Sequence, residues 1–294
     1  MDQAASPLSA RLTAAVERMP AFPRSVQQIL ELTRDINCPP KKLVEVIETD
    51  PVIAIKILRI VNSAYFSLPS KITSINQSVV YLGLNTLKNL ALNFSTIGML
   101  PQHNAAGFDT RRYLLHALLT AGMTRTLVEQ YAVGEADPTD AYTVGLLHNF
   151  GKIVFAQFMP EEFRQALAMS AAEGIPLHHA ESAAIGADHA YVGAMLARHW
   201  QFAPLLVECI AGHHQGSGNG ALAECLHCAD LIAEDLCAEA FGDPPREDDG
   251  EAGGDGPGIA PRFGDDLQAI ADGLGDLEDM VRKARLFCNA ESMQ

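Results

Sequence analysis

Aromatic residues are scarce in this chain: they make up 6% of its 294 residues, with a single tryptophan. Hydrophobic residues nevertheless reach 48% of the chain, and many of them are alanine and leucine. This composition favours packed helices over a β-sandwich. The second half also lacks any useful run in which apolar and polar residues alternate, as they would in a half-buried strand. The sequence therefore predicts an all-α fold.

Basic residues are also few. Lysine and arginine number 21 against 36 acids, which gives a formal net charge of −15, and −10 of it falls between Asp243 and Asp279. A chain without a basic stripe is a poor candidate for binding a phosphate backbone. One helix–glycine–helix pattern around Gly83 leaves a nucleic-acid-binding regulator as a weaker alternative, but its second helix carries Lys88 as its single base. We therefore expect no nucleic-acid partner.

Long uninterrupted apolar runs are missing as well. The longest apolar stretch, residues 79–100, is interrupted by several polar side chains: Asn85, Lys88, Asn89, Asn93, Ser95 and Thr96. These would be costly in hydrocarbon, so the stretch predicts a buried helix and no membrane partner. The first residues do not form a basic start followed by an apolar core. Six cysteines without a regular framework are typical of reduced thiols. We expect a cytoplasmic protein.

Apolar periodicity and capping residues predict helices along most of the chain. In the first part, Asp50 followed by Pro51 predicts a helix start, and Ser74 followed by Gln77 predicts a capping box. Gly83 is expected to break the helical run that follows. The expected helices span residues 6–19, 25–35, 39 onward, 50 onward, 74 onward, 85 onward, 108–131, around 148, 160–173, 188–200, 204–214, 220–240 and 267–286. Residues 242–264, rich in Gly, Pro and acid, predict a mobile loop.

Histidines are concentrated in the second half, with eight of the ten lying between His116 and His214. A lone histidine is usually a core or surface residue. Here His148, His189 and the His213–His214 pair all fall at expected helix ends, where side chains from separate helices can converge on a metal ion. Imidazole ligates several transition metals, so the ion is not selected by residue type. The pair Cys225 and Cys228 has no second pair nearby and is interpreted as buried thiols.

Several motifs together resemble the HDOD proteins, regulatory relatives of the HD-type metal-dependent phosphohydrolases. The resemblance runs from about residue 20 to 236. It is carried by "ETDPVIAIKILRIVNSAYFSLPSKITSINQSVVYLGLNTLKNL", "VGLLHNFGK", "HAYVGAMLARHW" and "IAGHH". It implies a two-lobed helical bundle whose C-terminal lobe is HD-like. The implied segments are an N-terminal lobe 1–105, the HD-like lobe 106–241, the acidic loop 242–264 and a C-terminal helix 265–294.

The resemblance also implies a set of site residues. The matching positions for a metal site are His116, His148, Asn149, His189, His213, His214 and Asp230. Lys152 matches the lysine that follows the His-Asp pair of HD-type hydrolases. Two positions depart from the metal-binding pattern: Asn149 replaces the aspartate of the pair, and Arg112 stands where diiron relatives offer a glutamate.

Asparagine at position 149 is a neutral, weaker donor than a carboxylate. We therefore expect a residual site for about one divalent ion (Fe, Ni, Zn or Mn) and no required cofactor. The favoured function is a bacterial signalling scaffold that binds a protein partner or a small ligand without phosphoester turnover. The alternative is a metal-dependent phosphohydrolase acting on nucleotides or cyclic dinucleotides, in which Lys152 contacts a phosphate.

Overall fold

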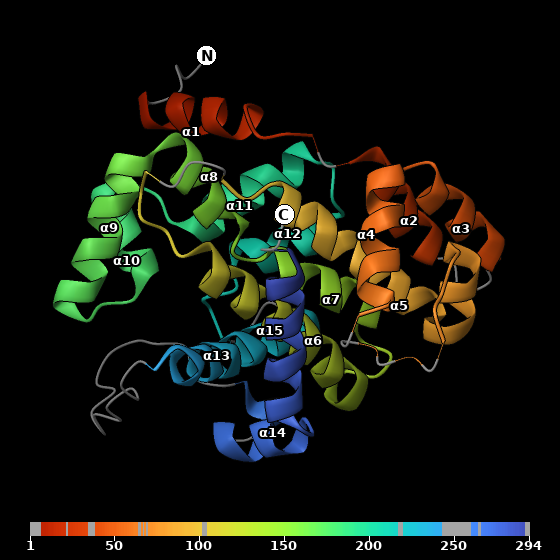
Figure 1. The fold of residues 1–294 in the computed structure, drawn as a ribbon. Helices are drawn as coiled ribbons and strands as arrows, with labels where there is room; N and C mark the ends of the chain where they lie inside the picture. Colours follow the sequence, from red (N-terminus) through yellow and green to blue (C-terminus); the bar gives the residue numbers. More distant parts are fainter. Residues whose placement is uncertain are drawn as a thin grey trace. The chain divides into compact units, whose positions relative to one another are not determined.

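The structure, a computed structural model, describes residues 7–21, 23–34, 39–63, 66, 68, 70–101, 105–216, 220–242, 260–263 and 266–291. In this part of the chain every regular element is a helix (Figure 1). The elements are α1 (Pro7–Glu17), α2 (Arg24–Arg34), α3 (Pro40–Glu48), α4 (Pro51–Val61), α5 (Ile75–Gly98), α6 (Thr110–Tyr131), α7 (Pro138–Leu147), α8 (Phe150–Phe158), α9 (Pro160–Glu173), α10 (Leu177–Ala184), α11 (His189–His199), α12 (Pro204–Ala211), α13 (Ala221–Phe241), the 3₁₀ turn η1 (Pro261–Phe263), α14 (Leu267–Gly273) and α15 (Leu277–Glu291).

The chain forms two compact units, so the predicted all-α, two-lobed fold is confirmed. One unit combines Met1–Ala21 with Leu100–Ile270, and the other combines Phe22–Met99 with Ala271–Gln294. Helix α1 is therefore grouped with the HD-like helices, although it precedes the first lobe in the sequence. The C-terminal residues from Ala271 are grouped with α2–α5, although they follow the HD-like lobe. The predicted C-terminal helix is divided into α14 and α15.

In the smaller unit, α5 packs against α2, α3 and α4. The predicted helix starts are present: Asp50 accepts a hydrogen bond from the Ile53 amide at 3.1 Å, and Ser74 accepts one from the Gln77 amide at 3.1 Å. Gly83 has φ 77° and ψ 165°, which are not helical values, so α5 consists of two helical segments that meet at the predicted break. Phe94 stacks on Phe287 with ring centroids 5.2 Å apart and so joins α5 to α15.

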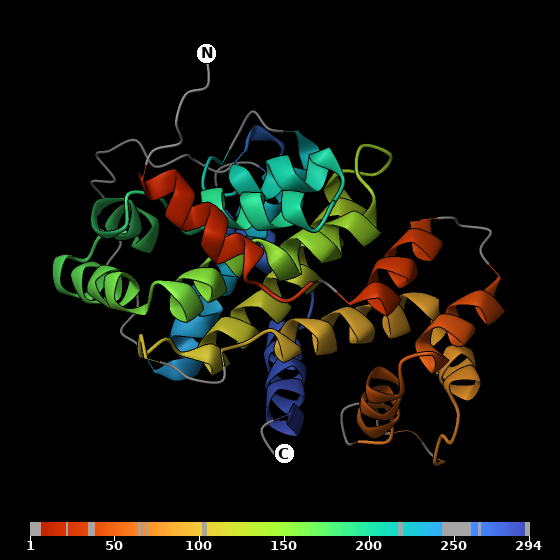
Figure 2. The same cartoon turned by 90° about the horizontal axis from the view of Figure 1, so that it is seen from above.

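In the larger unit, α6 packs along α7 and α13, while α11 packs against α8 and α12. Helix α1 lies against α11 and α8 (Figure 2). Two glycines allow these helices to approach closely. A Cβ atom at Gly145 would lie 2.7 Å from Ala121 Cα, and one at Gly151 would lie 2.0 Å from the His189 carbonyl oxygen. Both glycines flank His148, so its backbone lies close to α6 on one side and to α11 on the other.

The predicted mobile loop, residues 242–264, falls mostly outside the described residues. Its described end is packed: Ala260 and Phe263 are buried. Arg262 forms ion pairs with Glu224 of α13 and with Glu135, which follows α6. The rings of Phe263 and Tyr131 pack in a T-shaped arrangement with centroids 5.3 Å apart. The interpretation of the whole segment as a loop without anchors is therefore wrong for residues 260–263.

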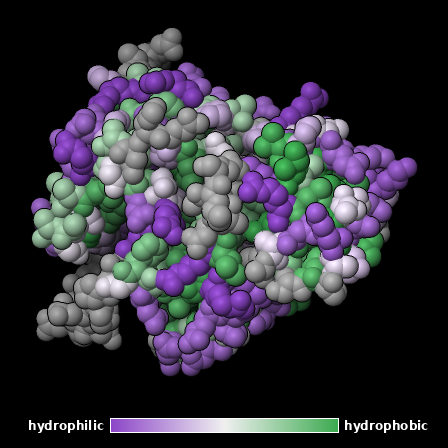
Figure 3. Space-filling view, viewed as in Figure 1, coloured by the Kyte–Doolittle hydropathy of each residue, from purple (hydrophilic) through white to green (hydrophobic). Residues whose placement is uncertain are grey.

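None of the described helices combines the length and the apolar character needed to span a bilayer. The surface in Figure 3 mixes hydrophilic residues with smaller hydrophobic areas. The first turn of α15 carries Glu278 and Asp279, whereas Phe287 is buried. This helix is therefore amphipathic, as its spacing predicts.

Candidate metal centre

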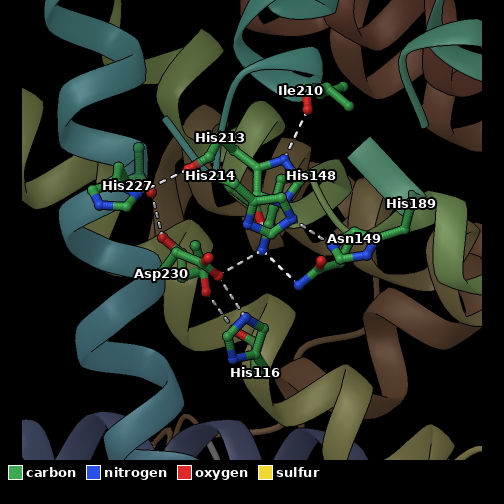
Figure 4. Close-up of polar contacts among 12 residues, drawn as sticks. His116, His148, Asn149, His189, Ile210, His213, His214, His227 and Asp230 are labelled. Carbon is green, nitrogen blue, oxygen red and sulfur yellow. Dashed lines mark hydrogen bonds and ion pairs between the residues drawn. The ribbon is translucent and has the colours of Figure 1, made fainter. Parts of the chain in front are cut away.

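Two groups of three side chains each converge in the larger unit (Figure 4). The first triad consists of His116 on α6, His148 at the end of α7 and Asp230 on α13. The second triad consists of His189, the first residue of α11, with His213 and His214, which follow α12. Within each triad the potential ligand atoms lie within 4.8 Å of one another. The fold thus brings together all six of these residues singled out in the sequence.

The carboxylate of Asp230 joins the first triad. Its Oδ1 atom lies 2.8 Å from Nε2 of His116 and 2.9 Å from Nε2 of His148. Burial alone would raise the pKa of Asp230, but the two histidines beside its carboxylate outweigh burial and hold the pKa well below its usual range. Asp230 is therefore ionised and supplies the negative charge of the first triad.

A hydrogen bond to the backbone fixes which ring nitrogen of His148 carries the proton. Nδ1 lies 2.7 Å from the Gly145 carbonyl, which can only accept, so Nδ1 carries a hydrogen. Burial is the main cause that lowers the pKa of this ring, which favours its neutral form. Nε2 of the neutral ring therefore carries a lone pair, and this lone pair faces those of the Asp230 Oδ1 atom. A cation at this point relieves the repulsion, so the donor set fits a divalent metal ion.

His213 and His189 repeat this arrangement in the second triad. Nδ1 of His213 donates to the Ile210 carbonyl at 2.8 Å, and Nε2 is buried without a hydrogen-bond partner. Nδ1 of His189 lies 2.6 Å from the carboxylate of Glu181, and Nε2 lies 3.0 Å from Nε2 of His214. Burial lowers the pKa of His213 to about 3, and it also lowers the pKa values of His189 and His214. Neutral imidazoles with free Nε2 lone pairs are the form that ligates metals.

Asn149 lies at the edge of the first triad and is fully buried. Its Nδ2 atom is 2.7 Å from Nε2 of His148 and donates to that lone pair. Its Oδ1 atom is buried without a partner. The amide therefore competes for the ligand electrons of His148, while its own oxygen remains available as a weak donor. An aspartate here would offer two acceptors and a negative charge.

Two other predicted residues lie near the cluster. Lys152 is half-buried on α8, and its charge lowers the pKa of Glu181, although burial has the larger effect and raises that pKa to about 8. Arg112 lies one turn before His116 on α6, and its guanidinium carbon is 5.8 Å from the ring centroid of Phe241. The prediction that Arg112 opposes a second metal ion stays a prediction.

Three further residues contact the triads and were not predicted as site residues. Glu181 holds His189, and His178 stacks on His214 with ring centroids 4.0 Å apart. His227 donates from Nδ1 to the His213 carbonyl at 2.9 Å. His227 lies one turn before Asp230 on α13, which is the one sequence signal that could have found it. Glu181 and His178 had no such signal, because the sequence predicts no helix over residues 177–184, which form α10.

The interpretation of Cys225 and Cys228 as buried thiols is confirmed, since both are free and buried.

Known proteins resemble this chain in sequence and in fold. Residues 19–216 match the family model of the HDOD domain. An uncharacterized protein of Treponema pallidum (strain Nichols) is 28% identical over 208 residues, which are 69% of this chain and 40% of that protein. The chain thus spans less than half of this relative.

Solved structures share the fold. An HDOD domain protein from Geobacter sulfurreducens superposes with a TM-score of 0.69 at 21% identity, over 95% of this chain and 97% of that one. A proposed signal transduction protein from Marinobacter aquaeolei VT8 gives 0.74 at 21% identity, over 97% and 66%. A proposed phosphohydrolase from Shewanella amazonensis SB2B gives 0.68 at 23% identity, over 95% and 98%.

Proposed function

Because the chain belongs to the HDOD family, we propose that it is a regulatory module of bacterial signalling that does not turn over phosphoesters. It acts in the cytoplasm and binds a protein partner or a small ligand, and it does not bind nucleic acid or a membrane. The likeness to a protein named for signal transduction is compatible with this role. So is the absence of a bilayer-spanning helix among the described residues.

The histidine cluster of this module holds a divalent transition metal ion. His116, His148 and Asp230 would bind it first, because this triad contains the carboxylate that balances part of the charge. When bound in such a site, a divalent ion acts as a Lewis acid toward water and phosphoryl oxygens. His148 is suited to the site by its fixed Nδ1 proton, which leaves Nε2 free. The neutral second triad would bind an ion more weakly.

The absence of turnover rests on a single observation, the contact of Asn149 with His148. The amide donates to the lone pair that a metal would need. It also brings no negative charge to the first triad. Hydrolases of the HD type offer an aspartate at this position, and loss of that carboxylate weakens both the hold on metal and the activation of water.

The test compares four proteins purified without a histidine tag: wild type, His148→Ala, Asn149→Asp and His199→Ala. His199 is the matched control, because it is an exposed histidine at the end of α11 and belongs to neither triad. We expect about one metal ion per chain in wild type and in the control by elemental analysis, and less in His148→Ala. We expect no hydrolysis of bis(p-nitrophenyl) phosphate or cyclic dinucleotides above background with Mn, Fe, Ni or Zn.

The rival function is a metal-dependent phosphohydrolase acting on nucleotides or cyclic dinucleotides. The second triad favours it, because two groups of ligands side by side are the arrangement that two-metal hydrolases use. In that case all five triad histidines hold metal and Lys152 contacts a phosphate. Robust wild-type turnover that disappears in His148→Ala and persists in His199→Ala would establish this rival.

A further inference from the structure

Glu181, on α10, has a fully buried carboxyl group that touches the second triad. Its Oε2 atom accepts two hydrogen bonds from one residue: the backbone amide of His189 lies at 2.8 Å and the ring Nδ1 of His189 at 2.6 Å. Oε1 is buried without a partner. Because Glu181 binds both the backbone amide and the ring Nδ1 of His189, it fixes the plane of this ring as well as the backbone.

The need for Glu181 follows from where His189 lies on its helix. His148 and His213 follow α7 and α12, so each Nδ1 reaches a carbonyl three residues earlier, Gly145 or Ile210. His189 is the first residue of α11, where the backbone presents free N–H groups and no helical carbonyl precedes it. An acceptor for its Nδ1 must therefore come from another element, and α10 supplies it.

We propose that Glu181 is the positioning residue of the second triad: it holds the proton of His189 on Nδ1 and directs the Nε2 lone pair toward His213 and His214, which raises the affinity of this triad for a divalent ion. The affinity part rests on the metal binding proposed above. The tautomer part does not, because it concerns the metal-free protein. Outer carboxylates of this kind fix the tautomer and orientation of metal-binding histidines in many proteins.

A purely structural role as a helix cap is the competing explanation. Asp188 provides the comparison, because it caps the same helix by accepting from the Tyr191 amide at 2.7 Å. This hydrogen bond goes to a backbone amide and not to the His189 ring. If Glu181 were only a cap, Glu181→Ala and Asp188→Ala would have the same consequences. If Glu181 positions the ring, only Glu181→Ala alters the triad.

The first experiment reads the tautomer in metal-free protein by long-range ¹H–¹⁵N NMR of the histidine rings. In wild type and Asp188→Ala we expect His189 with a protonated Nδ1 and an unprotonated Nε2. Glu181→Ala should shift the proton to Nε2, whereas Glu181→Gln, whose amide oxygen still accepts, should keep it on Nδ1. A wild-type His189 protonated on Nε2, or an unchanged spectrum in Glu181→Ala, overturns the proposal.

The second experiment titrates metal-free protein with Co²⁺ and follows its visible absorption. We expect a tight first phase that His148→Ala removes and a weaker second phase. Glu181→Ala should weaken the second phase about ten- to hundredfold, with an intermediate effect in Glu181→Gln and none in Asp188→Ala. Equal weakening by Glu181→Ala and Asp188→Ala overturns the positioning role. A first phase without a second overturns the affinity part alone, and no Co²⁺ binding at all overturns the proposed metal site as well. Should Glu181→Ala not fold, Glu181→Gln against Asp188→Asn gives the same comparison.

Discussion

The Nδ2 atom of Asn149 lies 2.7 Å from Nε2 of His148 and donates a hydrogen bond to the lone pair of that ring nitrogen. The ring cannot turn away, because its Nδ1 is held by the Gly145 carbonyl at 2.7 Å. The neutral amide of Asn149 thereby brings no negative charge to the cluster, and it competes with a metal ion for Nε2 of His148. The predictions below follow from this arrangement and from the packing around it.

Asn149→Asp should tighten metal binding, because it replaces a hydrogen-bond donor by a second carboxylate beside Asp230. We expect an affinity gain of about tenfold or more for Zn²⁺ or Mn²⁺, which corresponds to at least ~1.4 kcal/mol. Isothermal titration of metal-free protein measures it. Without metal the variant should be less stable than wild type, since two buried carboxylates repel each other. An affinity equal to that of wild type would show that the amide does not compete for His148.

Metal-free protein should lose stability as the pH falls below about 6.5. Burial lowers the pKa values of His148, His189, His213 and His214, to about 3 for His213. The unfolded chain, with ordinary pKa values near ~6.5, then binds more protons than the folded chain. Each such histidine costs up to about 1.4 kcal/mol per pH unit on acidification.

The titration of Glu181 has the opposite effect on the pH dependence of stability. Burial raises its pKa to about 8, so its contribution to stability falls as the pH rises between its ordinary value and about 8. The free energy of unfolding, measured with denaturant in the presence of a chelator, should therefore be greatest near pH ~6.5. It should fall by at least about 2 kcal/mol by pH ~5. A flat profile over this range would contradict the neutral state of the histidines.

Gly151→Ala should destabilise the larger unit strongly. The new Cβ would lie 2.0 Å from the His189 carbonyl oxygen, and backbone atoms cannot yield as a flexible side chain does. We expect a loss of about 3 kcal/mol or more and a lower metal content. The matched control is Gly122→Ala in α6, where a Cβ meets nothing within 4 Å. That variant should gain about 0.5–1 kcal/mol, because alanine is the better helix former. Thermal unfolding of both variants provides the comparison.

Arg262→Ala should lower stability by about 1 kcal/mol, because its ion pairs with Glu224 and Glu135 attach the 260–263 segment to α13 and to the residues after α6. Arg282→Ala, which removes an exposed pair with Asp279 in α15, is the control and should have almost no effect. Denaturant titrations at low and high salt distinguish the two. Equal effects would mean that the segment contributes no anchoring.

Binding to duplex DNA at physiological salt should be weak and independent of sequence, because the net charge is −15. A gel-shift titration with random-sequence and genomic fragments measures this. Sequence-dependent affinity below about 1 μM would instead favour the helix–glycine–helix alternative around Gly83.

The sequence by itself determined the fold class and most helix ends, because these depend on local signals: apolar spacing and capping side chains such as Asp50 and Ser74. It also identified the six triad residues. Their places at helix ends indicated His148, His189, His213 and His214, and the resemblance to a family added His116 and Asp230. The tertiary structure decided what no local pattern contains. The pairing of His116 with Asp230 spans 114 residues, and the division into two triads depends on how α6, α11 and α13 pack. The lone pairs of His148 and His213 are directed by backbone carbonyls, which every sequence possesses, and that of His189 by Glu181, whose burial only packing decides.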